Sequence, residues 1–170
     1  EDLVDTILTI TKLNGPEKFY QMIGERIFFQ PVKDGEAREI LGYRVQFFDI
    51  QSTKAKQYGF TCSLKMEEIY FFGDEPYCEY EEPYAKDADW LLHEAFCLYR
   101  DREIYKPYEK HHATVKEACE DGENLGAKNL ILYHTEDKNL ENRRKLYTEE
   151  GRQYYHGNLI VPEDLERIIL

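Results

Sequence analysis

Four short segments place a carboxylate or a histidine at the end of an apolar run or directly before a helix. They are FFGDEPY with Asp74, DWLLHEAF with His93 and Glu94, EKHHATVKEA with His111 and His112, and LILYHTED with His134. Only one of the chain's five histidines lies elsewhere. Carboxylates and neutral imidazoles bind divalent cations, and a histidine with a carboxylate partner can act as a general acid near pH 7. These residue types indicate a metal site, an acid–base site, or both.

Each of these residues also has an ordinary structural interpretation. The alternatives are a turn aspartate for Asp74, a packed core side chain for His93, a solvated charge for Glu94, an exposed position for His111, a neighbour of a helix N-cap for His112, and the end of a buried strand for His134. We favour the core position for His93 and the exposed position for His111. For the other four residues we favour the functional interpretation because of the set as a whole: a carboxylate, a carboxylate–histidine pair and a terminal histidine follow consecutive strands.

The second half of the chain must position these groups, and it alternates between strand and helix patterns. The expected elements are strands over 88–96, 129–134 and 158–162 and helices over 113–125 and 139–156. This is an α/β arrangement, in which functional groups gather at strand ends. We predict a mixed sheet with both helices on one face.

The first half reads as a strand near residues 7–13, a helix over 16–24 that begins at Pro16, and a meander of strands. The meander is expected over 26–32, 40–50, 58–64 and 67–73. An acidic, tyrosine-rich loop follows over 75–89, whose tyrosines either pack around the site or stack on nucleic-acid bases.

Composition limits the class of protein. The chain has 170 residues, 42% of them apolar and 33% charged, which fits one soluble globular domain. No apolar run approaches the length of a membrane span, and four cysteines without CxxC spacing suggest a cytoplasmic protein with reduced thiols. The net charge of −12 disfavours long nucleic acids unless cations or a basic patch offset it. The chain begins without an initiator methionine, so we expect residues upstream.

The four segments together resemble the second half of the metallo-β-lactamase fold, and most closely its ribonuclease Z-like branch. The shared motifs are a Gly-Asp pair after a strand, a His-Glu-Ala loop, a histidine loop before a helix, and a late strand that ends in histidine. They occur in the same order as in the family. The resemblance implies the C-terminal half of an αβ/βα sandwich and a metal-dependent hydrolase, with zinc as the expected metal.

The resemblance also implies roles for individual residues. Asp74 resembles the carboxylate that bridges two metal ions, and His134 a ligand of the second. His112 resembles the histidine that protonates the leaving group, and Glu94 the carboxylate that orients it. Two divalent cations about 4 Å apart would generate hydroxide and stabilise an in-line phosphoryl displacement. The implied substrate is a small phosphodiester or RNA.

Two departures from the family leave a second interpretation open. The His-x-His-x-Asp-His motif is absent from residues 1–170, and Gln51 stands where a further ligand histidine is expected. A non-catalytic remnant or an acidic interaction domain with an incomplete metal site is therefore the alternative to a hydrolase. For this chain alone we expect weak or no zinc binding, and pairing through an open sheet face with a missing N-terminal half or a second copy.

Overall fold

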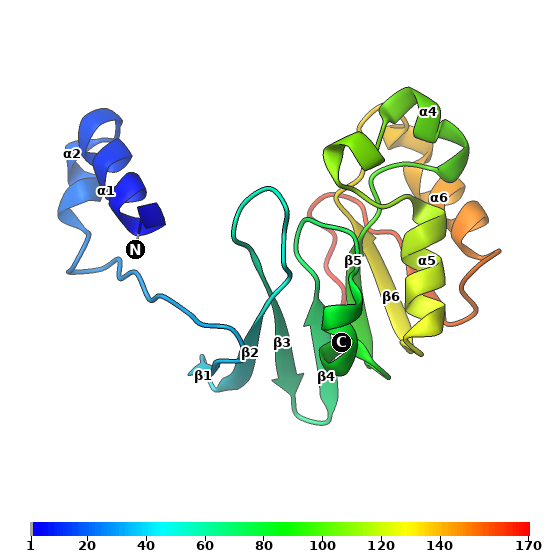
Figure 1. Cartoon of the computed structure of the whole chain (residues 1–170), viewed down its shortest axis with the longest axis horizontal. Coiled ribbons are helices and arrows are strands. Elements are labelled where there is room, and N and C mark those ends of the chain that lie inside the picture. Colours follow the sequence, from blue (N-terminus) through cyan, green and yellow to red (C-terminus); the bar gives the residue numbers. More distant parts are fainter. Residues whose placement is uncertain (1) are drawn as a thin grey trace. The chain divides into compact units, whose positions relative to one another are not determined.

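The computed structural model describes residues 2–170, apart from the side chain of Asp2, and divides into two compact units. The first, which ends at Lys33, contains helices α1 (Asp2–Asn14) and α2 (Glu17–Gln21). The second, Asp34–Leu170, contains the sheet and the remaining helices (Figure 1). None of the described helices is both long enough and apolar enough to span a bilayer.

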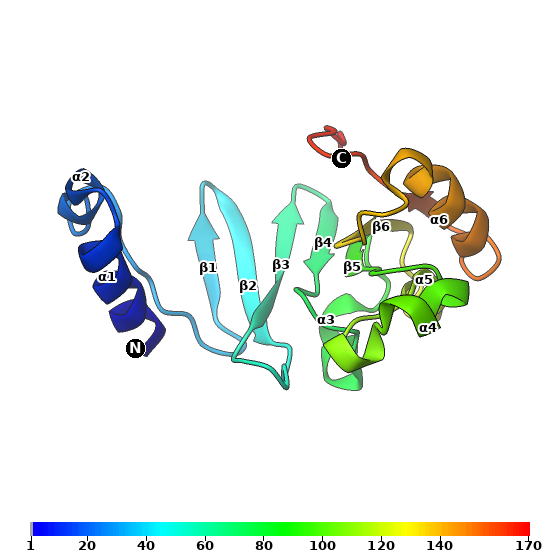
Figure 2. The same cartoon turned by 90° about the horizontal axis from the view of Figure 1, so that it is seen from above.

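The second unit is built on one mixed sheet of seven strands in chain order, and Figure 2 shows its first strands in that order from above. The strands are β1 (Ala37–Ile40), β2 (Tyr43–Asp49), β3 (Tyr58–Leu64), β4 (Glu67–Phe71), β5 (Trp90–Glu94), β6 (Asn129–Tyr133) and β7 (Asn158–Ile160). Strands β1 to β4 form an antiparallel meander, and β4 to β7 are parallel. This mixed α/β sheet confirms the predicted fold class.

The parallel strands are joined through helices, as parallel connections require. The helices are α3 (Glu82–Ala85), α4 (Arg102–Tyr105), α5 (Val115–Asn124) and α6 (Arg143–Gly151), with short 3₁₀ turns at Glu79–Glu81, Tyr99–Asp101, Tyr108–Lys110 and Leu140–Asn142. The two long predicted helices are present as α5 and α6, side by side (Figure 1). Gly151 permits this packing, because a Cβ there would lie 2.8 Å from Cys119 Sγ and 2.6 Å from Leu159 Cδ2.

The core lies between the sheet and these helices. Alternate residues of β6, Leu130 and Leu132, are buried in the same cluster as Val115 of α5 and Tyr147 of α6. Because successive side chains of a strand point to opposite faces, the residues between them belong to the other face of the sheet. The two faces of β6 are therefore distinct, and only one carries helices α5 and α6.

Two strand predictions in the first 33 residues are wrong. Residues 7–13 lie in the helix α1, because the apolar residues Leu3, Ile7 and Ile10 recur at helical spacing, and β-branching lowers helix propensity only slightly. Residues 26–32 form no strand, and Ile27 makes only an isolated bridge with Ile23.

The short helices α3 and α4 were not predicted, and α3 lies in the expected loop 75–89; the other differences are element boundaries. The apolar run 40–50 is interrupted at Leu41 and Gly42, whose φ angles are 53° and 84°. Positive φ at both central residues is the geometry of a two-residue hairpin turn, so this run supplies the end of β1 and all of β2. Helix α6 is shorter than predicted because the 3₁₀ turn Leu140–Asn142 precedes it and turns follow it.

Candidate metal centre

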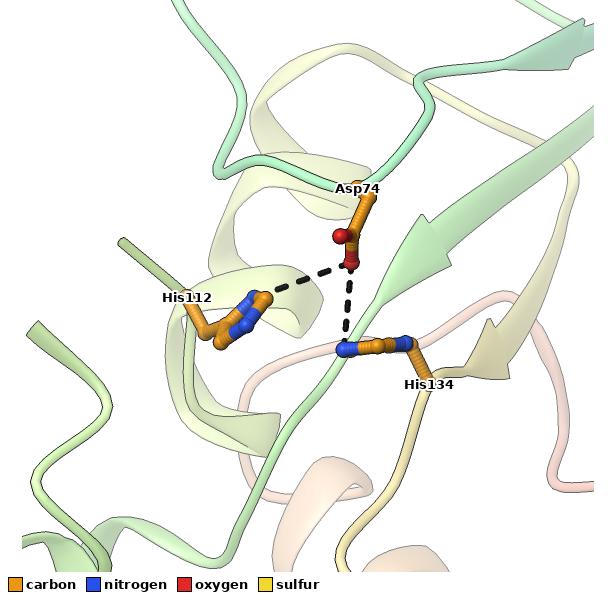
Figure 3. A group of neighbouring side chains, drawn as sticks. All are labelled: Asp74, His112 and His134. Carbon is orange, nitrogen blue, oxygen red and sulfur yellow. Dashed lines mark ion pairs between the residues drawn. The ribbon is translucent and has the colours of Figure 1, made fainter. Parts of the chain in front are cut away.

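Asp74, His112 and His134 converge at the ends of three different elements (Figure 3). The Oδ1 atom of Asp74 lies 3.1 Å from Nε2 of His134 and 3.9 Å from Nδ1 of His112. One ligand atom from each residue lies within 4.8 Å of the other two. The structure therefore brings together three residues that the sequence placed 38 and 22 positions apart (112 − 74 and 134 − 112).

The backbone before Asp74 explains the glycine of the Gly-Asp pair. Gly73 has a φ of +90°, and a Cβ there would lie 3.1 Å from Ile50 Cδ1. Residues with a side chain rarely adopt such φ values, so glycine is required for the turn that directs Asp74 into the site. The hydroxyl of Tyr133, at the end of β6, donates a hydrogen bond to the Gly73 carbonyl. This bond ties the Asp74 loop to the strand that carries His134.

His134 follows β6 with a φ of 53°, in the left-handed region. Its side chain is 41% exposed, and its ring lies 4.7 Å from the ring of His112, centroid to centroid. Positive φ is uncommon for residues other than glycine and is often found where a side chain must be directed into a site. The ring of His134 thus lies beside that of His112 at the end of β6, and its role as a metal ligand stays a prediction.

His112 is held in the loop that enters α5. Thr114 is the N-cap of that helix: its hydroxyl accepts from the backbone N–H of Glu117, whose carboxylate accepts from the backbone N–H of Thr114. The imidazole of His112 is buried and stacks on Phe96 at 5.0 Å. Burial, then the positive charge of Lys54, lowers the pKa of His112 to about 4. Its ring is therefore neutral at pH 7, the form that binds a metal.

Glu94 lies beneath His112 and is fully buried. Its Oε1 accepts a 2.5 Å hydrogen bond from the backbone N–H of Ala113, and its Oε2 lies 3.5 Å from Nδ1 of His112. We expected Glu94 to lie within hydrogen-bonding reach of His112, and 3.5 Å is the limit of that reach; Glu94 Oε2 and His112 Nδ1 both lack a hydrogen-bond partner among the described residues. Burial raises the pKa of Glu94 to about 7, so near neutral pH this carboxyl carries a proton for part of the time.

The donor set fits a divalent cation. Asp74 Oδ1 and His112 Nδ1 are buried polar atoms without hydrogen-bond partners among the described residues, and such groups are costly unless something satisfies them. A carboxylate and two imidazoles are suitable zinc ligands, and a structural zinc site commonly has four. Three groups are therefore enough to begin a site and too few to complete a two-metal site.

The other residues of the four segments lie where we expected. His93 is fully buried, with Nδ1 2.7 Å from the Glu94 carbonyl and Nε2 3.3 Å from Asp121 Oδ2. His111 is exposed.

Gln51, in the loop between β2 and β3, is also exposed, with a φ of 53°, and its backbone N–H donates to Asp49. Its role in place of a ligand histidine stays a prediction.

One residue beside the centre, Lys54, is not indicated by any sequence motif. Lys54, in the loop between β2 and β3, points its Nζ at the Asp74 carbonyl, 3.5 Å away. The loop sequence contains several polar residues, and no motif distinguishes Lys54 from Lys56. Only the folded loop shows which lysine reaches the site.

Comparison with known proteins agrees with this architecture. No family model matches the sequence. Ribonuclease Z of Bacillus thuringiensis (strain Al Hakam) and that of Bacillus mycoides (strain KBAB4) are each 33% identical over 98 residues, which is 58% of this chain and 31% of the relative. The match thus spans about a third of the length of these curated relatives.

Solved structures show the same fold. The metallo-β-lactamase fold protein YhfI from Bacillus subtilis matches with a TM-score of 0.66 at 18% identity, over 86% of this chain and 58% of that one. The short form of human tRNase Z matches with 0.54 at 22% identity, over 73% and 40%. A diphosphatase from the PhnP family matches with 0.59 at 16%, over 91% and 55%.

The fold and the placement of the four segments define the class: the chain has a metallo-β-lactamase fold. Over 98 residues the sequence is similar to ribonucleases Z, and a tRNase Z is among the structural neighbours.

Proposed function

We propose that this chain forms part of a metal-dependent phosphodiester hydrolase. The observation that carries the proposal is the convergence of Asp74, His112 and His134, with buried polar atoms that lack hydrogen-bond partners among the described residues. The similarity to ribonuclease Z and to a diphosphatase supports a phosphorus ester as the substrate class, either RNA or a small phosphodiester. Zinc is the metal we expect, because imidazole and carboxylate are among its usual ligands.

In this proposal Asp74 and His134 hold the metal. When bound, a divalent cation supplies a nucleophilic hydroxide near neutral pH and stabilises charge on the phosphoryl oxygens. His112 and Glu94 act as a proton-holding pair. Glu94, with its pKa near 7, holds a proton beside the neutral ring of His112; it would give this proton to Nδ1 as Nε2 releases one to the leaving oxygen, which leaves Glu94 as a carboxylate.

A second assignment is available for His112. One of its ring nitrogens belongs to the three-atom group that a single cation could contact, and its lowered pKa keeps that ring neutral. As a third ligand it would hold the metal and donate no proton. A non-catalytic remnant remains the alternative function, because two cations need more ligands than these three groups provide.

We also propose a partner layer on the sheet face opposite α5 and α6. That face carries a row of stacked aromatic rings, with Phe60 on Phe71 and Phe71 on Tyr133, each pair at 5.1 Å. These rings are only partly buried. A missing N-terminal half of the fold, or a second copy, would cover them.

The four cysteines are free, which agrees with a reducing, cytoplasmic location.

The test is hydrolysis of bis(p-nitrophenyl) phosphate and of a precursor tRNA with added Zn²⁺ or Mn²⁺. We expect metal-dependent cleavage of at least one, lost in Asp74→Asn. His156→Ala is the matched control, because His156 is exposed, pairs with Glu123 and lies outside the four segments. No cleavage of either by protein that carries a complete metal site would favour the non-catalytic alternative.

A further inference from the structure

The loop between β2 and β3, residues 50–57, bridges two sides of the metal centre. The hydroxyl of Ser52 donates a 2.6 Å hydrogen bond to Oε1 of Glu75, in the loop after β4. The hydroxyl of Thr53 lies 3.1 Å from Nδ1 of His111, in the loop before α5. The next residue along the chain, a lysine, is thereby held at the rim of the site from both sides.

That residue, Lys54, has only weak partners for its ammonium group. Its Nζ lies 3.5 Å from the Asp74 carbonyl and 4.0 Å from Oε1 of Glu75, which already accepts the Ser52 hydroxyl. Both distances exceed those of strong charge-assisted hydrogen bonds. An ammonium has three donors, and the side chain is 32% exposed, so Lys54 can donate to a further acceptor.

The charge of Lys54 acts on the same groups that form the centre. The Nζ of Lys54 lies 3.5 Å from the backbone carbonyl of Asp74, one of the three residues of the metal centre. Its positive potential therefore extends over the space that a substrate must enter to reach Asp74 and His134, which are 49% and 41% exposed. In a chain with net charge −12, this local cation would attract an anion where the overall field repels one.

We propose that Lys54 binds a non-bridging phosphate oxygen of the substrate at the metal centre. The inference rests on the proposed phosphodiester function and assigns it a residue that no sequence motif indicates. A phosphoryl group in transfer carries negative charge on its equatorial oxygens, and positively charged side chains preorganised toward them stabilise that charge. Lys54 is a compact ammonium held by its neighbours at that position.

The competing explanation is that Lys54 only pins the Asp74 loop through the backbone carbonyl. The two roles differ in what is lost on substitution. If Lys54 only holds the Asp74 loop in place, its substitution would lower metal content and stability. A phosphate ligand would lower the affinity for phosphate and leave metal content unchanged. Lys56 is the matched control, because it lies in the same loop but forms an ion pair with Asp49.

The experiment is titration calorimetry of the 170-residue chain with inorganic phosphate at low salt, with and without Zn²⁺, beside zinc content and thermal unfolding. We expect Lys54→Ala to weaken phosphate binding roughly 10-fold or more, the effect of losing a hydrogen bond to a charged group. Lys54→Arg should retain most of the affinity, and Lys56→Ala all of it. Zinc content should be the same in all variants.

Three outcomes would overturn the inference: no phosphate binding by the wild type, equal binding by Lys54→Ala, or loss of zinc in Lys54→Ala that accounts for its weaker phosphate binding. Failure of the proposed function is a separate result. A chain that binds phosphate through Lys54 but cleaves no phosphodiester would support the inference about Lys54 and contradict the proposed hydrolase function.

Discussion

The hydroxyl of Tyr133 donates a hydrogen bond to the backbone carbonyl of Gly73, 60 positions earlier in the chain. Burial raises the pKa of Tyr133, so the hydroxyl keeps its proton and remains a donor near neutral pH. Because Tyr133 precedes His134 and Gly73 precedes Asp74, this bond joins the two segments that carry the proposed metal ligands.

Tyr133→Phe should therefore lower both stability and metal affinity. The buried carbonyl loses its donor, at a cost of about 1–2 kcal/mol in the free energy of unfolding, and zinc affinity should fall roughly 10-fold. The control is Tyr155→Phe, which removes a 2.7 Å bond to the Ala127 carbonyl at a buried position that takes no part in the centre. It should destabilise to a similar extent and leave zinc affinity unchanged. Equal zinc affinity in both variants would show that the Tyr133 bond does not position the ligands.

Gly73→Ala should be more costly than Gly35→Ala. Both glycines have positive φ, +90° and +73°, so each substitution forces alanine into a region that costs about 1–2 kcal/mol. A Cβ at Gly73 also meets Ile50, whereas a Cβ at Gly35 has nothing within 4 Å. Chemical denaturation gives the difference between the two variants. If both lose the same stability, the contact with Ile50 relaxes without cost.

The roles of the two histidines can be separated in a protein that carries its complete metal site. His112→Ala should reduce turnover roughly 10²- to 10⁴-fold, as for loss of a general acid, with metal content nearly unchanged. His134→Ala should reduce metal content as well as turnover. The measurements are steady-state rates and elemental analysis on the same samples. Equal metal loss in both variants would make His112 a ligand.

The buried carboxyl of Glu94 should make the stability of the metal-free protein depend on pH. Its pKa is raised by burial from 4.5 to about 7, so between these values the folded state binds more protons than the unfolded state. Stability from this group is present below pH 4.5 and is lost as the pH rises to about 7, with a slope of at most about 1.4 kcal/mol per pH unit.

The measurement is the difference between wild type and Glu94→Gln in urea unfolding at a series of pH values in the presence of EDTA. Glutamine keeps the shape and removes the titration, so the difference should change steadily between pH 4.5 and 7. Glu81→Gln is a useful companion, because Glu81 is also buried, with a pKa raised to about 7, on another element. A difference curve for Glu94→Gln that is flat across this range would contradict the raised pKa.

The 170-residue chain by itself should hold zinc weakly and should pair. Three ligand groups are fewer than a stable site uses, and the aromatic face of the sheet is only partly buried. Elemental analysis after dialysis should find less than one zinc per chain, and light scattering should give a mass above that of a monomer. A monomer with two tightly bound metals would contradict both expectations.

The sequence was sufficient for the second half of the fold. Residues 88–162 alternate between buried strand and amphipathic helix, and each motif residue lies next to a local signal: Gly73 before Asp74, the capping residue Thr114 after His112, and the apolar run before His134. Such signals depend on a few neighbouring residues and can be read without coordinates. In the first 33 residues Pro16 marks the start of α2, but over residues 7–13 the β-branched residues led to a strand where helical spacing prevailed.

The tertiary structure decided which motif residues lie close together and how deeply each is buried. The sequence could not show that Asp74 and His134 approach to 3.1 Å, that burial shifts the pKa of Glu94 upward and of His112 downward, or that Lys54 rather than Lys56 reaches the site. Each of these depends on distances between residues at least 18 positions apart (112 − 94) and on how much water the fold excludes. Local sequence determines which groups stand at the ends of strands, and the order and register of the strands determine which of those groups meet.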